Sequence, residues 1–268
     1  MMIFLKLGGS LITDKARAQF ARLDVLRRLA GEIAEARKRL PEVRLLVGHG
    51  SGSFGHFVAT RTKTHLGATT QEDWEGFAEV WASANRLNRL VVDSLAEAGV
   101  PVVSFPPSAS ALCDEGSITD LAFEPIQRAL NAGLIPVIQG DAAFDRAQGS
   151  TIVSTEKVMS FLAHRLCPSR LLLAGIEEGV YRDFPSSREV LPVVTENDLE
   201  RIGLRGSHAR DVTGGMADKV VQALALAASL PDLEIRIFSG EVPGQVLSAL
   251  VGGAPGSLVR SVRPRPQQ

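Results

Sequence analysis

The sequence predicts an α/β fold in which a largely parallel open sheet carries helices on both faces. Six short runs are apolar on nearly every residue, and most of them end at or just before a glycine. Such runs are typical of parallel strands that are buried on both faces. The predicted strands are Ile3–Leu7, Arg44–Gly48, Val100–Phe105, Ile135–Gln139, Arg170–Gly175 and Glu234–Ser239.

Amphipathic helical patterns separate these strands. In Phe77–Leu95, apolar side chains recur at the i, i+3, i+4, i+7 spacing of one helical face. Leu23–Leu40 and Ala217–Leu230 are two further long helices, and Val158–Leu166 is a shorter one. Because strand and helix alternate along the chain, the strands are expected to run parallel, with helices on either side of the sheet.

The chain of 268 residues is long enough for one large α/β domain or for two closely joined lobes. The weakly marked segment Cys167–Ser169 is the candidate boundary, which would divide the chain into lobes 1–167 and 168–268. The formal net charge of −1 gives no overall basic field, so neither nucleic acid nor an anionic membrane surface is an expected partner.

The location of the protein is expected to be cytoplasmic. No apolar run reaches the ~18 residues that a membrane span needs, and the N-terminus reads as a strand rather than as a signal peptide. Cys113 and Cys167 show no metal-binding spacing. We expect both to be buried free thiols in a reducing compartment.

Two glycine-rich segments follow the first two predicted strands. Lys6–Ser10 places two glycines and a lysine at the end of one strand, and Gly48–His56 carries further glycines and a histidine after the next. Ligands of open α/β sheets bind beyond the carboxyl ends of the strands, so these segments are expected to converge. Their backbone N–H groups, with a helix N-terminus, are suited to an anion.

The second segment also permits two other interpretations. Gly50, Gly52 and Gly55 match the G-x-G-x-x-G fingerprint of NAD-dependent Rossmann enzymes, but the acids about 20 residues on, Glu72 and Asp73, fall at a predicted helix start. A dehydrogenase is therefore the alternative from a different chemistry. The surroundings of Ser53 only approximate the nucleophile elbow of a hydrolase, which makes that function more distant.

Two later segments complete the candidate site. Gln139–Asp145 is expected to be a loop after a strand, and its Asp141, together with Glu156 further on, is expected to orient lysines. Asp211–Lys219 precedes the last long helix and places Lys219 in its first turn. A cation there opposes the helix dipole, which makes sense if a phosphate occupies the N-terminus beside Gly215.

Together, the glycine segments, lysines, histidine and carboxylates indicate phosphoryl transfer, which depends on positioning and charge neutralisation. The sequence contains no Walker A motif, none of the protein-kinase signatures and no zinc-type spacing of cysteine or histidine. A small-molecule kinase outside those classes is the function that remains.

The order of these motifs resembles the amino acid kinase superfamily along nearly the whole chain. Lys15 and the segments His49–His56 and Val103–Ser108 are similar to the isopentenyl phosphate kinase branch. The resemblance implies a three-layer αβα sandwich, with an acceptor-binding N-terminal lobe (1–167) and an ATP-binding C-terminal lobe (168–268). It also implies ATP as phosphoryl donor, Mg²⁺ held mainly by the ATP phosphates rather than by protein ligands, and a homodimer.

The resemblance assigns roles to individual residues. Lys15 would stabilise the transition state, and Lys6, His56 and Lys219 would share in catalysis. Residues implied at the nucleotide are Lys6, Gly8, Gly9, Ser10, Gly52, Asp183, Gly215 and Lys219. Residues implied at the acceptor phosphate are Ser51, His56 and Thr155.

The sequence departs from the pattern of this branch at two places. Ser51 stands where the branch usually has glycine, which would strain the backbone if φ is positive there. Thr155 and Glu156 replace the usual Gly-Asp after Ser154, and this indicates a possible shift in acceptor preference. Two alternatives therefore stay open: a related kinase of another phosphate or phosphonate such as fosfomycin, and a binding protein without transfer activity.

Overall fold

A single sheet of eight strands forms the centre of the part of the chain that the computed structural model describes, which is residues 1–182, 187–199, 202 and 215–262. Every neighbouring pair is parallel except β11 and β12. In spatial order, the strands are β10 (Val193–Val194), β12 (Ser257–Val259), β11 (Glu234–Ser239), β9 (Arg170–Gly175), β1 (Met2–Leu7), β2 (Arg44–His49), β6 (Ile135–Gln139) and β3 (Val102–Ser104).

All six predicted strands are present in this sheet, as β1, β2, β3, β6, β9 and β11, although β3 is shorter than expected. Strand β1 lies in the middle and pairs with β2 on one side and β9 on the other. Strands from both sides of Cys167 therefore share one sheet. The short link to β9 is fixed at Ser169, whose backbone N–H donates to the carbonyl of Met2 (2.9 Å).

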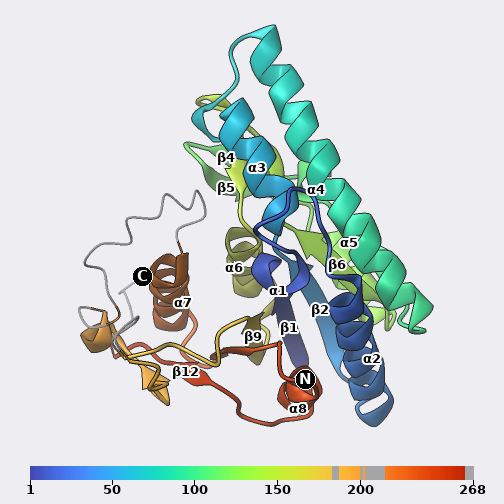
Figure 1. Cartoon of the computed structure of the whole chain (residues 1–268), viewed down its shortest axis with the longest axis vertical. Coiled ribbons are helices and arrows are strands. Elements are labelled where there is room, and N and C mark those ends of the chain that lie inside the picture. Colours follow the sequence, from blue (N-terminus) through green and yellow to red (C-terminus); the bar gives the residue numbers. More distant parts are fainter. Residues whose placement is uncertain (183–186, 200–201, 203–214, 263–268) are drawn as a thin grey trace.

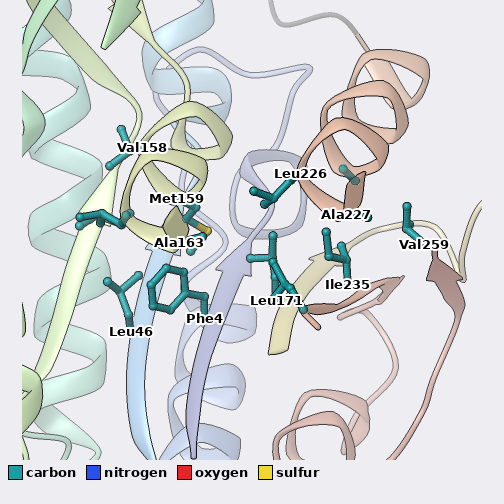
Figure 2. Close-up of a cluster of buried hydrophobic side chains, with 14 of the residues drawn as sticks. Phe4, Leu46, Val158, Met159, Ala163, Leu171, Leu226, Ala227, Ile235 and Val259 are labelled. Carbon is teal, nitrogen blue, oxygen red and sulfur yellow. The ribbon is translucent and has the colours of Figure 1, made fainter. Parts of the chain in front are cut away.

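Helices cover both faces of the sheet, so the predicted three-layer αβα sandwich is confirmed (Figure 1). The alternating residues of β1 explain why the strand is apolar throughout. Ile3 and Leu5 pack into a core under α2, α4 and α8, and Phe4 packs into the opposite core under α6 and α7 (Figure 2). The bounds of these helices are α2 (Leu23–Arg39), α4 (Gln71–Glu97), α8 (Gln245–Leu250), α6 (Thr155–Leu166) and α7 (Gly215–Ser229).

Shorter helices complete the two layers. Helix α1 (Gly9–Ile12) follows β1 directly, and α3 (Gly52–Thr62) follows β2. Helix α5 (Glu124–Asn131) packs beside β6 and β2 through Ile126 and Leu130. The two helices that begin just after β1 and β2 carry the glycine segments identified in the sequence.

A second, four-stranded sheet was not expected. Its order is β5 (Ser117–Asp120), β4 (Leu112–Asp114), β7 (Asp141–Asp145) and β8 (Gly149–Val153). The loop predicted at Gln139–Asp145 is therefore wrong, because only Gly140 separates β6 from β7. The strands of this sheet are three to five residues long, too short to show a clear alternation of buried and exposed side chains.

The cysteines are free, but only one is buried. Cys113 lies in β4 and is buried, whereas Cys167 is exposed where α6 ends in a left-handed conformation (φ 46°). The expectation of two buried thiols is therefore wrong for Cys167. Among the helices of the described residues, none combines the length and apolar character needed to cross a membrane.

Candidate active site

The two predicted glycine segments meet in direct backbone contact. A Cβ atom on Gly9 would lie 2.5 Å from the amide nitrogen of Gly52, and one on Gly50 would lie 2.8 Å from the amide nitrogen of Gly9. The N–H of Gly8 donates to Ala174 O at the end of β9 (2.8 Å). Backbone can approach this closely only without side chains, so the convergence that the strand ends predict is confirmed at atomic detail.

Gly52 is the one residue of these segments with positive φ (+49°). A Cβ atom there would lie 2.1 Å from Thr13 Oγ1, so both the conformation and the space require glycine. Ser51 precedes it with φ −76° in the ordinary right-handed region. The strain that serine could have caused is therefore absent, since Gly52 takes the strained position.

Lys6 is buried at the end of β1 and is ion-paired with Glu156 near the start of α6. Burial alone would raise the pKa of Glu156, but the charges of Lys6 and then Lys219 outweigh it and hold the pKa below its ordinary value. The carboxylate is thus ionised near neutral pH and orients a lysine, as expected from the sequence. It joins β1, α6 and α7 in one charge cluster.

Lys219 lies near the N-terminus of α7, half-buried, and Gly215 begins that helix. The charge of Lys219 lowers the pKa of Glu156, the carboxylate that is paired with Lys6. This interaction links the start of α7 with the first glycine segment. Asp183, expected at the nucleotide, lies outside the described residues. The described part of the predicted nucleotide set thus gathers around the ends of β1 and β9 and the start of α7.

Lys15 is exposed on a short loop between α1 and α2. The loop is closed by the N–H of Asp14, which donates to Phe20 O (3.0 Å). Its far end is attached to α3, because the N–H of Phe20 donates to Ser53 Oγ (3.3 Å). Lys15 is therefore carried beside the second glycine segment rather than on a free loop.

A buried hydroxyl that the sequence analysis did not select holds these parts together. Thr13 Oγ1 donates to Gly9 O (2.7 Å) and accepts from the N–H of Ser53 (3.0 Å). One side chain thus links the first glycine segment with the start of α3. Its place two residues before the predicted catalytic Lys15 is the signal that could have found it.

Asp141 is buried, and burial raises its pKa to about 6 despite several hydrogen bonds that act in the opposite direction. Its carboxylate accepts from the backbone N–H groups of Ser108 (3.2 Å) and Ala142 (2.9 Å). This differs from the expectation that Asp141 orients a lysine. The carboxylate instead fixes the start of β7 and the turn at Ser108.

The residues implied at the acceptor lie on two different elements. Ser51 is the N-cap of α3, and His56 lies half-buried one turn further into the same helix. Thr155 opens α6 and is buried, and its hydroxyl donates to His49 O (2.6 Å). Ser51 and His56 therefore share the start of α3, while Thr155 anchors α6 to the end of β2.

Two cavities are lined by residues of the predicted site. One of about 820 Å³ is lined by Ser10 and Lys15, and also by Ile176 and Glu241 from the second half of the chain. The other, of about 570 Å³, lies between α6 and α7 and is lined by Glu156 and Lys219. Each cavity is thus lined by at least one of the predicted lysines, Lys15 in the larger and Lys219 in the smaller.

The geometry excludes the dehydrogenase interpretation. Glu72 and Asp73 lie in the first turn of α4, where Asp73 accepts from the N–H of Thr70 (2.8 Å) in a capping box. These acids are therefore committed to a helix start rather than to the strand end that the dinucleotide fingerprint requires. Within the described ranges, no cluster of three or more His, Cys, Asp or Glu could hold a metal ion.

Comparison with known proteins decides the family. The profile of the amino acid kinase family matches residues 1–239. The chain belongs to the amino acid kinase family. The predicted resemblance to this family and its fold are confirmed.

Relatives within the family include two archaeal isopentenyl phosphate kinases. The protein of Methanothermobacter thermautotrophicus is 34% identical over 262 residues, covering 94% of this chain and 96% of the relative. That of Haloferax volcanii is 34% identical, with 97% of this chain and 98% of the relative covered. A solved structure of isopentenyl phosphate kinase, 31% identical, superposes with a TM-score of 0.81 over 97% of this chain and 100% of its own. The predicted branch of the family is confirmed.

Proposed function

We propose that this protein transfers the γ-phosphoryl group of ATP to isopentenyl phosphate, forming ADP and isopentenyl diphosphate. The observation that carries the proposal is the backbone contact of Gly9 with Gly50 and Gly52, with Lys6 and Lys219 joined to the same place through Glu156. Full-length similarity to isopentenyl phosphate kinases supports the choice of acceptor.

The acceptor phosphate binds at the start of α3. Ser51 and His56 face it there, where the helix N-terminus favours an anion. The N-terminal lobe, residues 1–167, thus holds the acceptor. In this assignment Thr155 supports the acceptor site by anchoring the start of α6 to the end of β2, since its hydroxyl donates to His49 O.

The nucleotide lies on the side of residues 168–268, with its transferring phosphate at Gly8, Gly9, Ser10 and Gly52. An oxygen of the acceptor phosphate attacks the γ-phosphorus as the bond from that phosphorus to the β-phosphate oxygen breaks, so no strong general base is needed. Lys6, Lys15 and Lys219 neutralise the charge that spreads over the transferring group.

Mg²⁺ fits this site as an ion bound by the nucleotide rather than by a protein cage. The two buried carboxylates nearby are already occupied, Glu156 by Lys6 and Asp141 by backbone N–H groups. When bound with ATP, the ion would neutralise phosphate charge. We further propose that the protein is cytoplasmic and, as the family resemblance implies, a homodimer; a solution mass equal to one chain would contradict the dimer.

An acceptor panel tests the proposal. ADP release is measured with isopentenyl phosphate, dimethylallyl phosphate, longer prenyl phosphates and fosfomycin, for the wild type and for His56→Ala. We expect the highest kcat/KM with isopentenyl phosphate and a loss of about 100-fold in His56→Ala, typical of a positioned group in transfer chemistry. A His56→Ala protein with full turnover would contradict the role of His56, and a preference for fosfomycin would establish the alternative kinase.

A further inference from the structure

A buried chain of hydrogen bonds runs from strand β3 to the second glycine segment. Ser104 Oγ donates to Asn88 Oδ1 (2.7 Å), and Asn88 Nδ2 lies 3.0 Å from His49 Nε2. The other ring nitrogen, His49 Nδ1, lies 3.2 Å from Gly50 O. The imidazole has no exposed surface, and Asn88 is only 5% exposed.

The carbonyl of Gly50 determines which groups donate and which accept along this series of hydrogen bonds. A carbonyl oxygen only accepts, so the proton of His49 resides on Nδ1 and points at Gly50 O. Nε2 then accepts from the amide of Asn88, whose oxygen accepts from Ser104. Burial lowers the pKa of His49 to about 4, and the nearby charge of Lys6 acts in the same direction. The ring is therefore neutral, with a single tautomer, at neutral pH.

The backbone of His49 is fixed as firmly as its ring. Its carbonyl accepts from Thr155 Oγ1 (2.6 Å) and from the N–H of Gly140 (3.3 Å). The N–H of Gly50 donates to Leu7 O (3.0 Å). Contacts from α6, β1 and the residue after β6 thus converge on the peptide group between His49 and Gly50, while α4 holds the ring.

The second glycine segment, which begins at this peptide group, is packed tightly against the first. Gly50 lies so close to Gly9 that a shift of a few tenths of an ångström would change the packing of the two segments. Catalysis by positioning is sensitive to such shifts, since a misplacement of about 1 Å costs about 100-fold in rate.

We propose that His49 is a positioning residue, which holds the Gly50–Gly52 backbone against Gly9 through its Nδ1–H and its carbonyl without touching the substrates. The inference rests on the proposed function, because that function gives the segment its role in binding phosphate. Asn88 and Ser104 act through His49 by selecting its tautomer.

Variants of His49 separate positioning from simple filling of the core. In His49→Asn, the amide nitrogen stands where Nδ1 was and can still donate to Gly50 O. In His49→Gln, the amide lies where Nε2 was and cannot. We expect His49→Asn to keep kcat/KM within about 10-fold of wild type and His49→Gln to lose about 100-fold. Equal losses in the two variants would overturn the proposal.

Asn88→Asp tests the tautomer. The new carboxylate accepts from Nε2–H, which leaves an unprotonated Nδ1 against Gly50 O when the ring is neutral. At lower pH the ring takes up a second proton and the bond to Gly50 returns. We therefore expect kcat/KM of Asn88→Asp, relative to wild type, to rise as pH falls. Ser94→Ala on the same helix, which removes a bond to Leu90 O, is the control and should match the wild-type profile.

Amide hydrogen exchange across residues 50–56 gives a readout that needs no acceptor. Exchange there should be faster in His49→Gln and Asn88→Asp than in His49→Asn and Ser94→Ala, each compared at matched fractions folded. If wild type fails to use isopentenyl phosphate, the proposed function fails while this comparison still decides the role of His49. Unchanged exchange in all four variants would overturn the inference.

Discussion

At the scale of single residues, the site depends on buried opposite charges that compensate one another. Lys6 and Glu156 are both largely buried, and Lys6 would carry an uncompensated charge without Glu156. Removing one partner of a buried ion pair costs about 3–5 kcal/mol, more than the net value of the pair itself. The pair therefore fixes the position of Lys6 more than it adds to stability.

Glu156→Gln tests this pair. We expect lower kcat with a folded protein, and a loss of about 3–5 kcal/mol in the free energy of unfolding at neutral pH, since glutamine keeps the shape but leaves the charge of Lys6 uncompensated. A carboxyl whose folded pKa is depressed stabilises the fold above its unfolded pKa and loses that contribution as pH falls through the folded value. The stability gap between wild type and variant should therefore narrow below the ordinary value of 4.5, as followed by urea unfolding. A gap independent of pH would contradict the ionised pair.

The lysines, the glycines and the carboxylate Glu156 were predictable from the sequence, whereas the side chains that fix the backbone of the glycine segments were not. Lys6 and Gly52 stand in recognisable motifs at strand ends, where ligands of such sheets bind. Thr13 bonds to Ser53, and His49 bonds to Asn88 and Thr155; pairings between residues so far apart cannot be read from the local sequence. Asp141 was selected from the sequence as a partner for a lysine, but its carboxylate accepts from backbone N–H groups instead.

At the scale of elements, the two glycine segments tolerate little change, because their backbones are in direct contact. Each follows a central strand directly and leads into a helix, so the ends of β1 and β2 are forced into contact. The strands of the large sheet and the long helices were predictable because their apolar runs and helical spacing extend over enough residues to be recognised. The small sheet was not, because its strands are only three to five residues long and show no clear alternation of buried and exposed side chains.

A matched pair of glycine substitutions tests this difference between elements. Gly52→Ala places a Cβ against Thr13 at positive φ, so we expect a loss of at least about 1 kcal/mol in unfolding free energy and near-complete loss of activity. Gly31→Ala in α2 meets no atom within 4 Å and should add about 0.5–1 kcal/mol with normal activity. Full activity in Gly52→Ala would show that the contact between the segments is dispensable.

At the scale of the whole molecule, the candidate site joins residues from both halves of the chain. Arg22, just after the loop that carries Lys15, is ion-paired with Glu241 beyond β11. The larger cavity is lined from both sides of Cys167 as well. A ligand bound there would therefore stabilise the whole fold rather than one lobe.

Thermal unfolding measured with nucleotides tests whether a bound ligand stabilises the whole fold. ATP with Mg²⁺ at 100 times its Kd would add about 2.7 kcal/mol, which corresponds to a rise in Tm of about 5 °C or more. NAD at the same concentration should leave Tm unchanged. A rise with NAD and none with ATP would restore the dehydrogenase interpretation.

Phosphorus NMR of a reaction containing the protein, MgATP and isopentenyl phosphate tests the proposed phosphoryl transfer most directly. We expect the monophosphate signal to be replaced by two mutually coupled diphosphate signals as ADP accumulates in equal amount. A monophosphate signal that stays unchanged while ATP is stable, or while ATP is hydrolysed to ADP and inorganic phosphate, would contradict it.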